Sequence, residues 1–494
     1  MKTYNDYMQE LTSADVYKGL VAYGLFPERM PPVFTSEAFY NYCNKLVAPF
    51  SDVPHTYAYY ENIRNINIPR PMGIPVPMAY QRLCRYIADN WQEIQNYFQT
   101  CRGEENHCVS RIHVRKMFNT DKIFDMNYDD WRNDPDPDTD LQIGAKYAVH
   151  ADVSKCFPSI YTHAIPWALV GKTAAKQKLK GTWYNELDHR LQFMKDRETH
   201  GLLIGPHASN IISEILLCKI DSKLTPRWKY VRHIDDYTCY VMTEEEADEF
   251  IAELQTQLRA YDLSLNHKKT KIEKLPIAAI ERWIRKINSI SIITSYGKVD
   301  YKNCRTYLDY AIEIAQSHNW DASVLKYAIK VLAGKELTDN AKAYEQKTIF
   351  HLCLMYPYLV PLLDPYVFGK CGTTPTDICF IANKIYDTYS RLKIYEPMSY
   401  ALYFAAKYGF EITGVNVPMI IDTKDATLLT ISFIYYKKHK NKTAIRDLKT
   451  FARDRDEKEF EQLWYFAYEI LPAKDLKKEW KGMKQARVSF LVDL

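Results

Sequence analysis

Residues 230–241, YVRHIDDYTCYV, constrain the fold of this chain more than any other stretch. Two runs rich in β-branched and aromatic residues flank the adjacent aspartates Asp235 and Asp236. In the second run, apolar or aromatic side chains recur with a period of two, as at Tyr237 and Cys239. This pattern predicts a β-hairpin with both carboxylates at its bend. Because adjacent carboxylates repel one another, a bound cation is one explanation for the pair, and an ordinary acidic turn is the other.

Three further features stand in order around the predicted hairpin. A β-rich run from Lys146 ends at Asp152, which places that carboxylate where a strand opens to a site. A turn-rich loop follows, in which Gly201 and Gly205 allow the backbone to approach a ligand closely, and it leads into an amphipathic helix. After the hairpin, residues 263–272 predict a basic turn and a strand.

Together these features predict nucleotidyl transfer. That reaction needs two divalent ions held by a few carboxylates, with little covalent help from the protein. Asp152 and Asp235 are expected to bridge both ions, and Asp236 lies beside them. Mg²⁺ prefers oxygen ligands, so an all-carboxylate site predicts Mg²⁺ as the cofactor, with Mn²⁺ as an alternative.

A basic strand is predicted upstream, at residues 110–117. The alternation places Arg111, His113 and Arg115 on one face of this strand. A cationic face of this kind can bind a triphosphate through charge-assisted hydrogen bonds. The alternative is a solvated edge strand, for which basic side chains are equally suitable.

The overall fold class predicted is α+β with a helical second half. Glycine makes up only 16 of 494 residues, which favours helix. From about residue 281 the pattern becomes one of paired amphipathic helices, for example over residues 305–317, 321–333, 399–408 and 457–470. We therefore expect two domains, residues 1–280 with the catalytic motifs and residues 281–494 as an α-helical, HEAT-like domain.

Charge and cysteine usage restrict the environment of the protein but not its chemistry. A net charge of +4 requires no nucleic-acid partner. The 11 cysteines are scattered and form no C-x-x-C pair, which predicts a reduced, cytoplasmic protein. The sequence starts without an apolar signal core and contains no window of 18 uninterrupted apolar residues, so we expect no membrane association.

The ordered motifs resemble those of reverse transcriptases. Residues 152–157 resemble the first palm motif, 201–210 the second, 233–236 the third and 263–271 the fourth. A further stretch, IYTHAIPWA at residues 160–168 with GKTAAKQ at 171–177, is similar to the AbiK-type abortive-infection polymerases of phage defence. The length resembles their shorter, prophage-borne branch. The resemblance implies reverse-transcriptase-like fingers and palm over residues 60–275, followed by the helical repeat-like domain.

The resemblance also implies an activity. Members of that family make DNA without a template, use a protein tyrosine as primer, form homo-oligomers (trimers or hexamers) and block phage growth. It implies dNTPs as substrates and a single-stranded DNA product covalently attached to a tyrosine. By the same resemblance Phe157 is a steric gate against ribonucleotides, Lys269 donates a proton to pyrophosphate, and Arg111, Arg115 and Gly205 contact the nucleotide.

Two positions depart from the family pattern, and they leave alternatives open. His233 stands where Tyr or Phe is usual, and Ile204 stands where many members carry Gln before Gly205. An isoleucine side chain cannot hydrogen-bond to a nucleotide or template, which weakens templated copying more than metal chemistry. The alternatives are a templated RNA-directed DNA polymerase with a bound non-coding RNA, and a non-catalytic assembly module. None of the 39 tyrosines is singled out as the primer.

Overall fold

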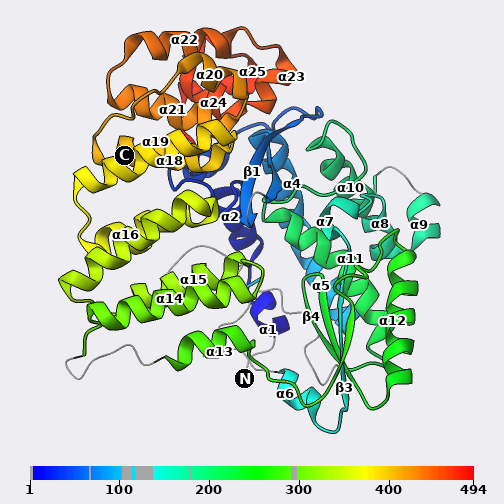
Figure 1. Cartoon of the computed structure of the whole chain (residues 1–494). Coiled ribbons are helices and arrows are strands. Elements are labelled where there is room, and N and C mark those ends of the chain that lie inside the picture. The colour runs from blue at the N-terminus through cyan, green and yellow to red at the C-terminus, as the bar shows by residue number, and fades with distance from the viewer. Residues whose placement is uncertain (1–3, 66–67, 103–113, 118–136, 178–180, 291–296) are drawn as a thin grey trace.

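The structure is a computed structural model that describes residues 4–65, 68–102, 114–117, 137–177, 181–290 and 297–494. A small sheet and its covering helices form one side of the molecule, and a curved stack of helices forms the other (Figure 1). The β1–β2 hairpin lies between these two sides, close to the upper helices of the stack. The mixed first half and the helical second half agree with the predicted α+β class.

The larger sheet has four antiparallel strands in the order β4-β5-β3-β6. Its strands are β3 (Tyr147–Asp152), β4 (Tyr230–His233), β5 (Asp236–Val241) and β6 (Lys271–Lys274). The predicted hairpin is confirmed, because His233 pairs with Asp236 across the turn. The basic turn followed by a strand at 263–272 is also observed, with β6 beginning at Lys271.

One face of this sheet is buried under two helices. Tyr230 contacts Phe250 of α12 (Glu244–Arg259) at a ring-centroid distance of 5.9 Å. The same tyrosine donates a hydrogen bond of 2.8 Å to Asp221 of α11 (Ala208–Leu224). Side chains alternate along a strand, so Tyr230 and its neighbours two residues away point to the helices. Asp152 and Asp236 face the other side of the sheet, which these helices leave uncovered.

The remaining elements of the first half surround the sheet and the β1–β2 hairpin. The hairpin strands β1 (Tyr57–Asn65) and β2 (Ile68–Pro75) pair antiparallel, and α2 packs against α4. The helices are α1 (Tyr4–Gln9), α2 (Ser13–Tyr23), α3 (Glu37–Cys43), α4 (Pro77–Asp89), α5 (Trp91–Arg102), α6 (Pro137–Gln142), α7 (Cys156–Ser159), α8 (Ala164–Val170), α9 (Lys172–Gln177) and α10 (Trp183–Phe193).

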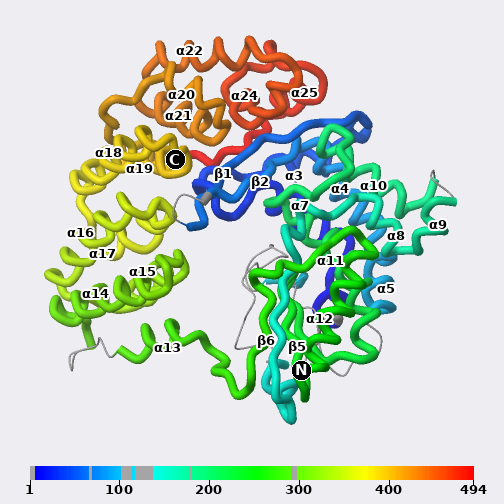
Figure 2. The backbone as a smooth tube through the Cα atoms, turned by 45° about the vertical axis from the view of Figure 1, so that its right-hand side comes forward, coloured from blue at the N-terminus to red at the C-terminus, as the bar shows by residue number. Residues whose placement is uncertain are grey.

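Helices make up the second half of the chain, and its described residues add only isolated β-bridges at Val299–Leu337 and at Leu491. Neighbouring helices pack in sequence, as in the pairs α18–α19 and α19–α21, and the stack curves back to β1 (Figure 2). The helices are α13 (Arg282–Ser289), α14 (Tyr301–Ser317), α15 (Ala322–Ala333), α16 (Asp339–Met355), η1 (Pro357–Leu362), η2 (Leu363–Phe368), α17 (Gly369–Cys371), α18 (Pro375–Leu392), α19 (Tyr395–Tyr408), α20 (Val417–Thr423), α21 (Ala426–Lys438), α22 (Lys442–Arg453), α23 (Glu457–Gln462), α24 (Trp464–Ile470), η3 (Ala473–Asp475) and α25 (Lys478–Gln485).

One predicted helix is wrong in its length. The segment 457–470 forms two helices, α23 and α24, that meet at Leu463. Tertiary packing accounts for the break. The indole of Trp464 is fully buried and donates a hydrogen bond to the carbonyl of Ile74 on β2 at 3.2 Å. A continuous helix would follow its own axis rather than turn at Leu463 to make this contact.

The two ends of the chain share one aromatic cluster. Phe26 and Phe39 from the N-terminal segment contact Phe490, and Phe26 stacks on Trp464 at 5.8 Å. Phe34 forms a β-bridge with Leu491. The predicted domains are therefore joined through a shared core, in which residues close to both ends take part.

Among the described residues, no helix is both long and apolar enough to cross a membrane. The ten cysteines in this part of the chain are all free thiols.

Candidate active site

Asp152 and Asp236 oppose each other on adjacent strands. Their Cα atoms are register partners in the β3–β5 ladder, and their side chains share the uncovered face of the sheet. Asp235 lies in the β4–β5 turn next to them, and its carbonyl accepts a hydrogen bond from Val153 N–H at 3.0 Å. The hairpin and the end of β3 thus bring together the three carboxylates selected from the sequence.

Asp152 is nearly buried, with 6% of its surface exposed, and both of its carboxylate oxygens are bonded. Oδ1 accepts a hydrogen bond from Asn266 Nδ2 at 2.9 Å, and Oδ2 contacts Lys269 Nζ at 2.8 Å. The carbonyl of Asp152 also accepts from Asn266 N–H at 2.7 Å. The turn before β6 therefore holds Asp152 in place from both its main chain and its side chain.

The three carboxylates raise the cost of negative charge in this site. Burial, followed by the neighbouring carboxylates Asp152 and Asp235, raises the pKa of Asp236 to about 7. The pKa of Asp235 is also raised, mainly by burial and further by Asp152, while Lys269 and Arg70 oppose the shift. The hydrogen bond to Asp152 raises the pKa of Lys269. Additional positive charge at this place would stabilise the ionised carboxylates.

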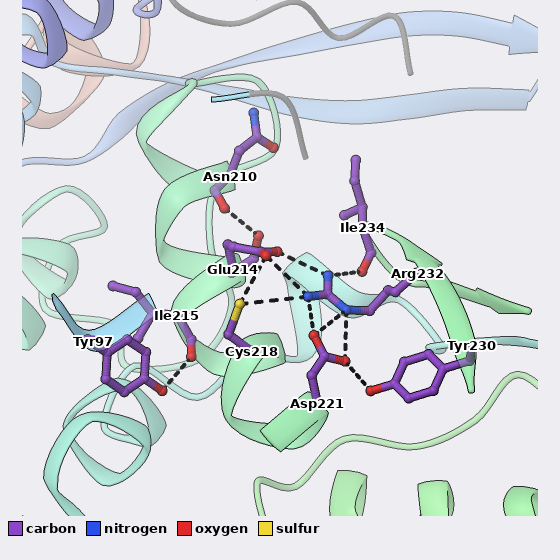
Figure 3. A network of polar contacts seen from close by, with 10 residues as sticks. Tyr97, Asn210, Glu214, Ile215, Cys218, Asp221, Tyr230, Arg232 and Ile234 are labelled. Carbon is purple, nitrogen blue, oxygen red and sulfur yellow. Dashed lines mark hydrogen bonds and ion pairs between the residues drawn. The ribbon is translucent and has the colours of Figure 1, made fainter. Parts of the chain in front are cut away.

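The turn that carries Asp235 has an unusual backbone. Ile234 adopts φ of +55°, a left-handed conformation that β-branched residues rarely take. Its carbonyl accepts a hydrogen bond from Arg232 Nη1 at 2.8 Å (Figure 3). Arg232 thus reaches from the preceding strand to the residue before Asp235 and stabilises the strained turn.

Arg232 belongs to a fully buried charged network under the sheet. Its Nη1 contacts Glu214 Oε2 at 3.0 Å, and its Nε contacts Asp221 Oδ2 at 3.0 Å, both carboxylates coming from α11. Tyr230 and Cys218 donate additional hydrogen bonds to Asp221 and Glu214 respectively. One guanidinium with two carboxylate partners links helix α11 to the catalytic turn.

The glycine loop packs against the β1–β2 hairpin. Gly205 has φ of +126°, and a Cβ atom there would come within 2.9 Å of Pro27. The carbonyl of Ile204 accepts a hydrogen bond from Gly73 N–H at 2.9 Å. Gly201, with φ of +84°, would place a Cβ 2.9 Å from the carbonyl oxygen of Pro158. The structure thus gives both glycines a packing reason, and the nucleotide contact of Gly205 stays a prediction.

The predicted nucleotide-binding residues Phe157, Arg111 and Arg115 do not lie together in the described structure. Phe157 lies in α7 directly after β3, is half-buried, and its carbonyl accepts from Leu202 N–H at 2.8 Å. Arg115 is buried against the N-terminal helices, with its guanidinium 5.4 Å from the ring centroid of Tyr7. Arg111 and His113 lie outside the described residues. The roles of Phe157, Arg111 and Arg115 in nucleotide binding stay predictions.

The residues fit a divalent metal by their chemistry. No group of three or more His, Cys, Asp or Glu side chains in the described part of the chain is arranged to hold an ion as it stands. Instead, the ammonium of Lys269 supplies the positive charge at Asp152. The raised pKa values of Asp235 and Asp236 show that their ionised forms lack compensating positive charge, which Mg²⁺ would supply. The oxygen atoms of the three carboxylates are also the ligands that Mg²⁺ prefers.

Three contributors to the site were not assigned a role from the sequence. Asn266 orients Asp152, Arg232 holds the turn, and Arg70 of β2 acts electrostatically on Asp235. The similarity of residues 263–271 to a known motif was the available signal for Asn266. The other two depend on tertiary contacts that no local pattern reveals.

Comparison with protein families identifies one segment of the chain as similar to reverse transcriptases. Residues 79–309 match the family model described as Reverse transcriptase (RNA-dependent DNA polymerase). This segment contains Asp152, Asp235, Asp236 and Lys269 and extends past the predicted boundary at residue 280. Residues 79–309 are therefore similar to a reverse-transcriptase domain. A search of curated proteins found no match.

Solved structures with detectable similarity include yeast telomerases. Apo telomerase from Candida tropicalis is 12% identical, with 78% of this chain and 76% of that chain covered and a TM-score of 0.32. A form truncated from the C-terminal domain is 15% identical, with 48% and 52% covered and a TM-score of 0.29, so this chain spans about half of its length. Telomerase from Candida albicans with a TWJ fragment of telomeric RNA is 10% identical, with 86% and 68% covered and a TM-score of 0.28.

Proposed function

We propose that this protein is a protein-primed, template-independent DNA polymerase that acts in abortive-infection defence against phage. The observation that carries the polymerase part is the Asp152–Asp236 pair on the open face of the sheet, with Asp235 in the adjoining turn. The defence role and the protein primer are supported by the resemblance of residues 160–177 to AbiK-type polymerases.

In this proposal Asp152, Asp235 and Asp236 hold Mg²⁺ or Mn²⁺. Bound metal ions would lower the pKa of the attacking hydroxyl and neutralise charge on the triphosphate and pyrophosphate. Lys269 is placed at Asp152 Oδ2 and would release its proton to the leaving pyrophosphate. Phe157, directly after β3, would exclude a ribose 2′-hydroxyl and so select dNTPs.

The position of Ile204 supports synthesis without a template, and burial restricts the choice of the primer tyrosine. Ile204 offers an alkyl side chain where an amide could bind a nucleotide, and its carbonyl is already bonded to Gly73. Protein priming requires an accessible tyrosine, which excludes the fully buried Tyr60, Tyr80 and Tyr230. Which of the accessible tyrosines serves as primer is a question for mass spectrometry of nuclease-trimmed protein.

The test is whether the protein purified from cells carries covalent DNA. We expect nuclease-sensitive smearing in a denaturing gel for the wild type, and none for Asp235→Asn. Asp248→Asn, an exposed aspartate on α12, is the matched control and keeps the smear. Size-exclusion chromatography with light scattering tests the proposed trimer or hexamer on the same samples. Wild-type protein that is free of DNA would overturn protein priming.

A second candidate is a templated RNA-directed DNA polymerase with a bound non-coding RNA. The description of the matched family model as an RNA-dependent DNA polymerase favours it. DNA-free protein that copies an added primed RNA would establish this candidate in place of the first. A non-catalytic assembly module is disfavoured, because the chain retains all three carboxylates.

A further inference from the structure

A second candidate site lies between the N-terminal half and the helical stack, away from Asp152, Asp235 and Asp236. It is a cavity of about 370 Å³ formed where the loop after α2 and strand β1 face α15, η1 and α19. Its walls include Arg29, Asn62, Lys326, Lys330 and Tyr358. None of the residues around it is one of the three aspartates or their hydrogen-bond partners. The volume lies within the range of small-molecule sites, roughly 300–1,000 Å³.

Three cations, Arg29, Lys326 and Lys330, line this cavity together with two carboxylates, Glu28 and Asp364. Within the part of the chain that the structure describes, Arg29, Lys326 and Lys330 make no ion pair. Lys326 contacts the carbonyl of Arg64 at 3.4 Å and the ring of Tyr358 at 4.9 Å, and Lys330 lies 5.7 Å from the ring of Tyr366.

Asp364, which lines the cavity, and Glu396, which lies beside it, already accept hydrogen bonds from other groups. Asp364 accepts hydrogen bonds from Lys407 and Tyr408. Glu396 accepts from Tyr60, Asn62 and the main chain of Ile63. Burial, together with the nearby Arg29, Arg64 and Lys330, lowers the pKa of Lys326 to about 8, although Glu396 opposes the shift. The cations therefore repel one another, and a bound anion would relieve that repulsion.

Two buried polar groups in the same walls also have no partner. Asn62 is 3% exposed and Tyr358 is 2% exposed, and both line the cavity. Among the described residues, Asn62 Oδ1 and the Tyr358 hydroxyl lack hydrogen bonds. Buried polar atoms without partners are rare, and they indicate a missing ligand or water. Tyr358 can donate to a phosphate oxygen, whereas Asn62 Oδ1 requires a donor.

We propose that this cavity binds a deoxynucleoside triphosphate, with its phosphate groups held by Arg29, Lys326 and Lys330. Three cations suit a polyphosphate, and a guanidinium binds phosphate oxygens in pairs. Pyrophosphate shares this anion chemistry, but its only donors are P–OH groups. A nucleotide has amino and hydroxyl donors and fits the walls better.

The experiment is a calorimetric titration of full-length Asp235→Asn protein with dATP, pyrophosphate and inorganic phosphate in the presence of EDTA. Without divalent ions the three aspartates cannot hold a triphosphate through a metal, and the lysine variants below identify the binding that belongs to the cavity. We expect one dATP per chain. Lys326→Gln and Lys330→Gln should each weaken binding at least tenfold, whereas Lys347→Gln, an exposed lysine on α16, should not change it.

The titrations distinguish a nucleotide site from a pyrophosphate site and from no binding site at all. No binding of dATP, or equal binding by the wild-type cavity and both Lys→Gln variants, overturns the proposal. Pyrophosphate binding as tightly as dATP overturns the nucleotide assignment in favour of a pyrophosphate site. Lys330 is exposed, so we expect Lys330→Glu to fold like the parent protein, and thermal unfolding curves check this. This variant is a second test of the site, because the added negative charge should abolish dATP binding. The choice of a deoxynucleotide rests on the proposed function, but the catalytically inactive protein still tests the site if that function is wrong.

Discussion

The guanidinium of Arg232 donates a hydrogen bond to the carbonyl of Ile234, one residue before Asp235. This contact connects the buried face of the sheet to the turn that carries Asp235, one of the three proposed metal ligands. The left-handed Ile234 is held there by a group that is itself fixed by two carboxylates of α11. The position of Asp235 therefore depends on charges that no solvent reaches.

Replacing Arg232 by methionine should destabilise the protein and impair metal use. The change leaves Glu214 and Asp221 buried without their cation, which costs about 3–5 kcal/mol. Arg227→Met is the matched control, because Arg227 pairs with Glu249 and Glu253 on the exposed surface and should contribute under about 1 kcal/mol. Thermal unfolding measures the first effect. The Mg²⁺ concentration for half-maximal polymerisation should rise in Arg232→Lys, and an unchanged value would show that the network supports the fold only.

Replacing Lys269 should slow polymerisation without unfolding the protein. The side chain is mostly exposed and bonds Asp152, so Lys269→Met removes a proton donor and a neutralising charge. We expect a loss of about 10²–10⁴ in the rate of nucleotide addition, the usual value of general acid catalysis. Lys268→Met, the exposed neighbour, is the control. Single-turnover rates with saturating dNTP measure the effect, and equal rates for both variants would remove Lys269 from the mechanism.

Shortening Phe157 should relax the choice of sugar. If its ring meets the 2′-position, Phe157→Ala should raise the use of ATP relative to dATP by about 10–200-fold, the usual effect of filling or emptying a small pocket. Phe193→Ala, which alters another half-buried ring on α10, should leave the ratio unchanged. Competition between labelled ATP and dATP gives the ratio directly. An unaltered ratio in Phe157→Ala would place the gate elsewhere.

Glu396 should make stability depend on pH. Burial raises the pKa of this carboxyl from 4.5 to about 7, so the folded protein holds the proton more tightly than the unfolded chain. Its contribution is complete below about pH 4.5 and is lost as the pH rises through 7, a change of about 3 kcal/mol. Melting temperatures of the wild type should fall relative to those of Glu396→Gln between pH 5 and 8. Parallel curves would show that Glu396 stays ionised throughout.

The hairpin and the position of Asp152 could be predicted because their signals are local. A period of two marks a strand, and a charged residue at the end of that period marks where the strand leaves the core. In the same way, the shift to helical periodicity after residue 281 predicted that the second half of the chain is α-helical. The break at Leu463 could not be predicted, because it depends on Trp464 reaching Ile74 from far along the chain.

The buried network was missed for a different reason. Arg232 is charged, and a charged residue in a strand is usually expected to face solvent. In the structure Arg232 points to α11, where Glu214 and Asp221 neutralise it. The periodicity of apolar residues predicts which side chains are buried. It does not predict that two acidic residues of a distant helix will neutralise the charge of a buried arginine. The same limit applies to Arg70, whose effect on Asp235 comes through space from β2.

The bridge between Phe34 and Leu491, with the hydrogen bond from Thr35 N–H to the carbonyl of Phe490, has a consequence for biosynthesis. A ribosome delivers residue 490 long after it has delivered residue 35, so the N-terminal segment emerges without its pairing partner. The aromatic cluster around Phe26 and Trp464 cannot close until translation has passed both. Nascent chains should therefore hold an incomplete polymerase, and mature enzyme should accumulate only after the late residues are released from the ribosome.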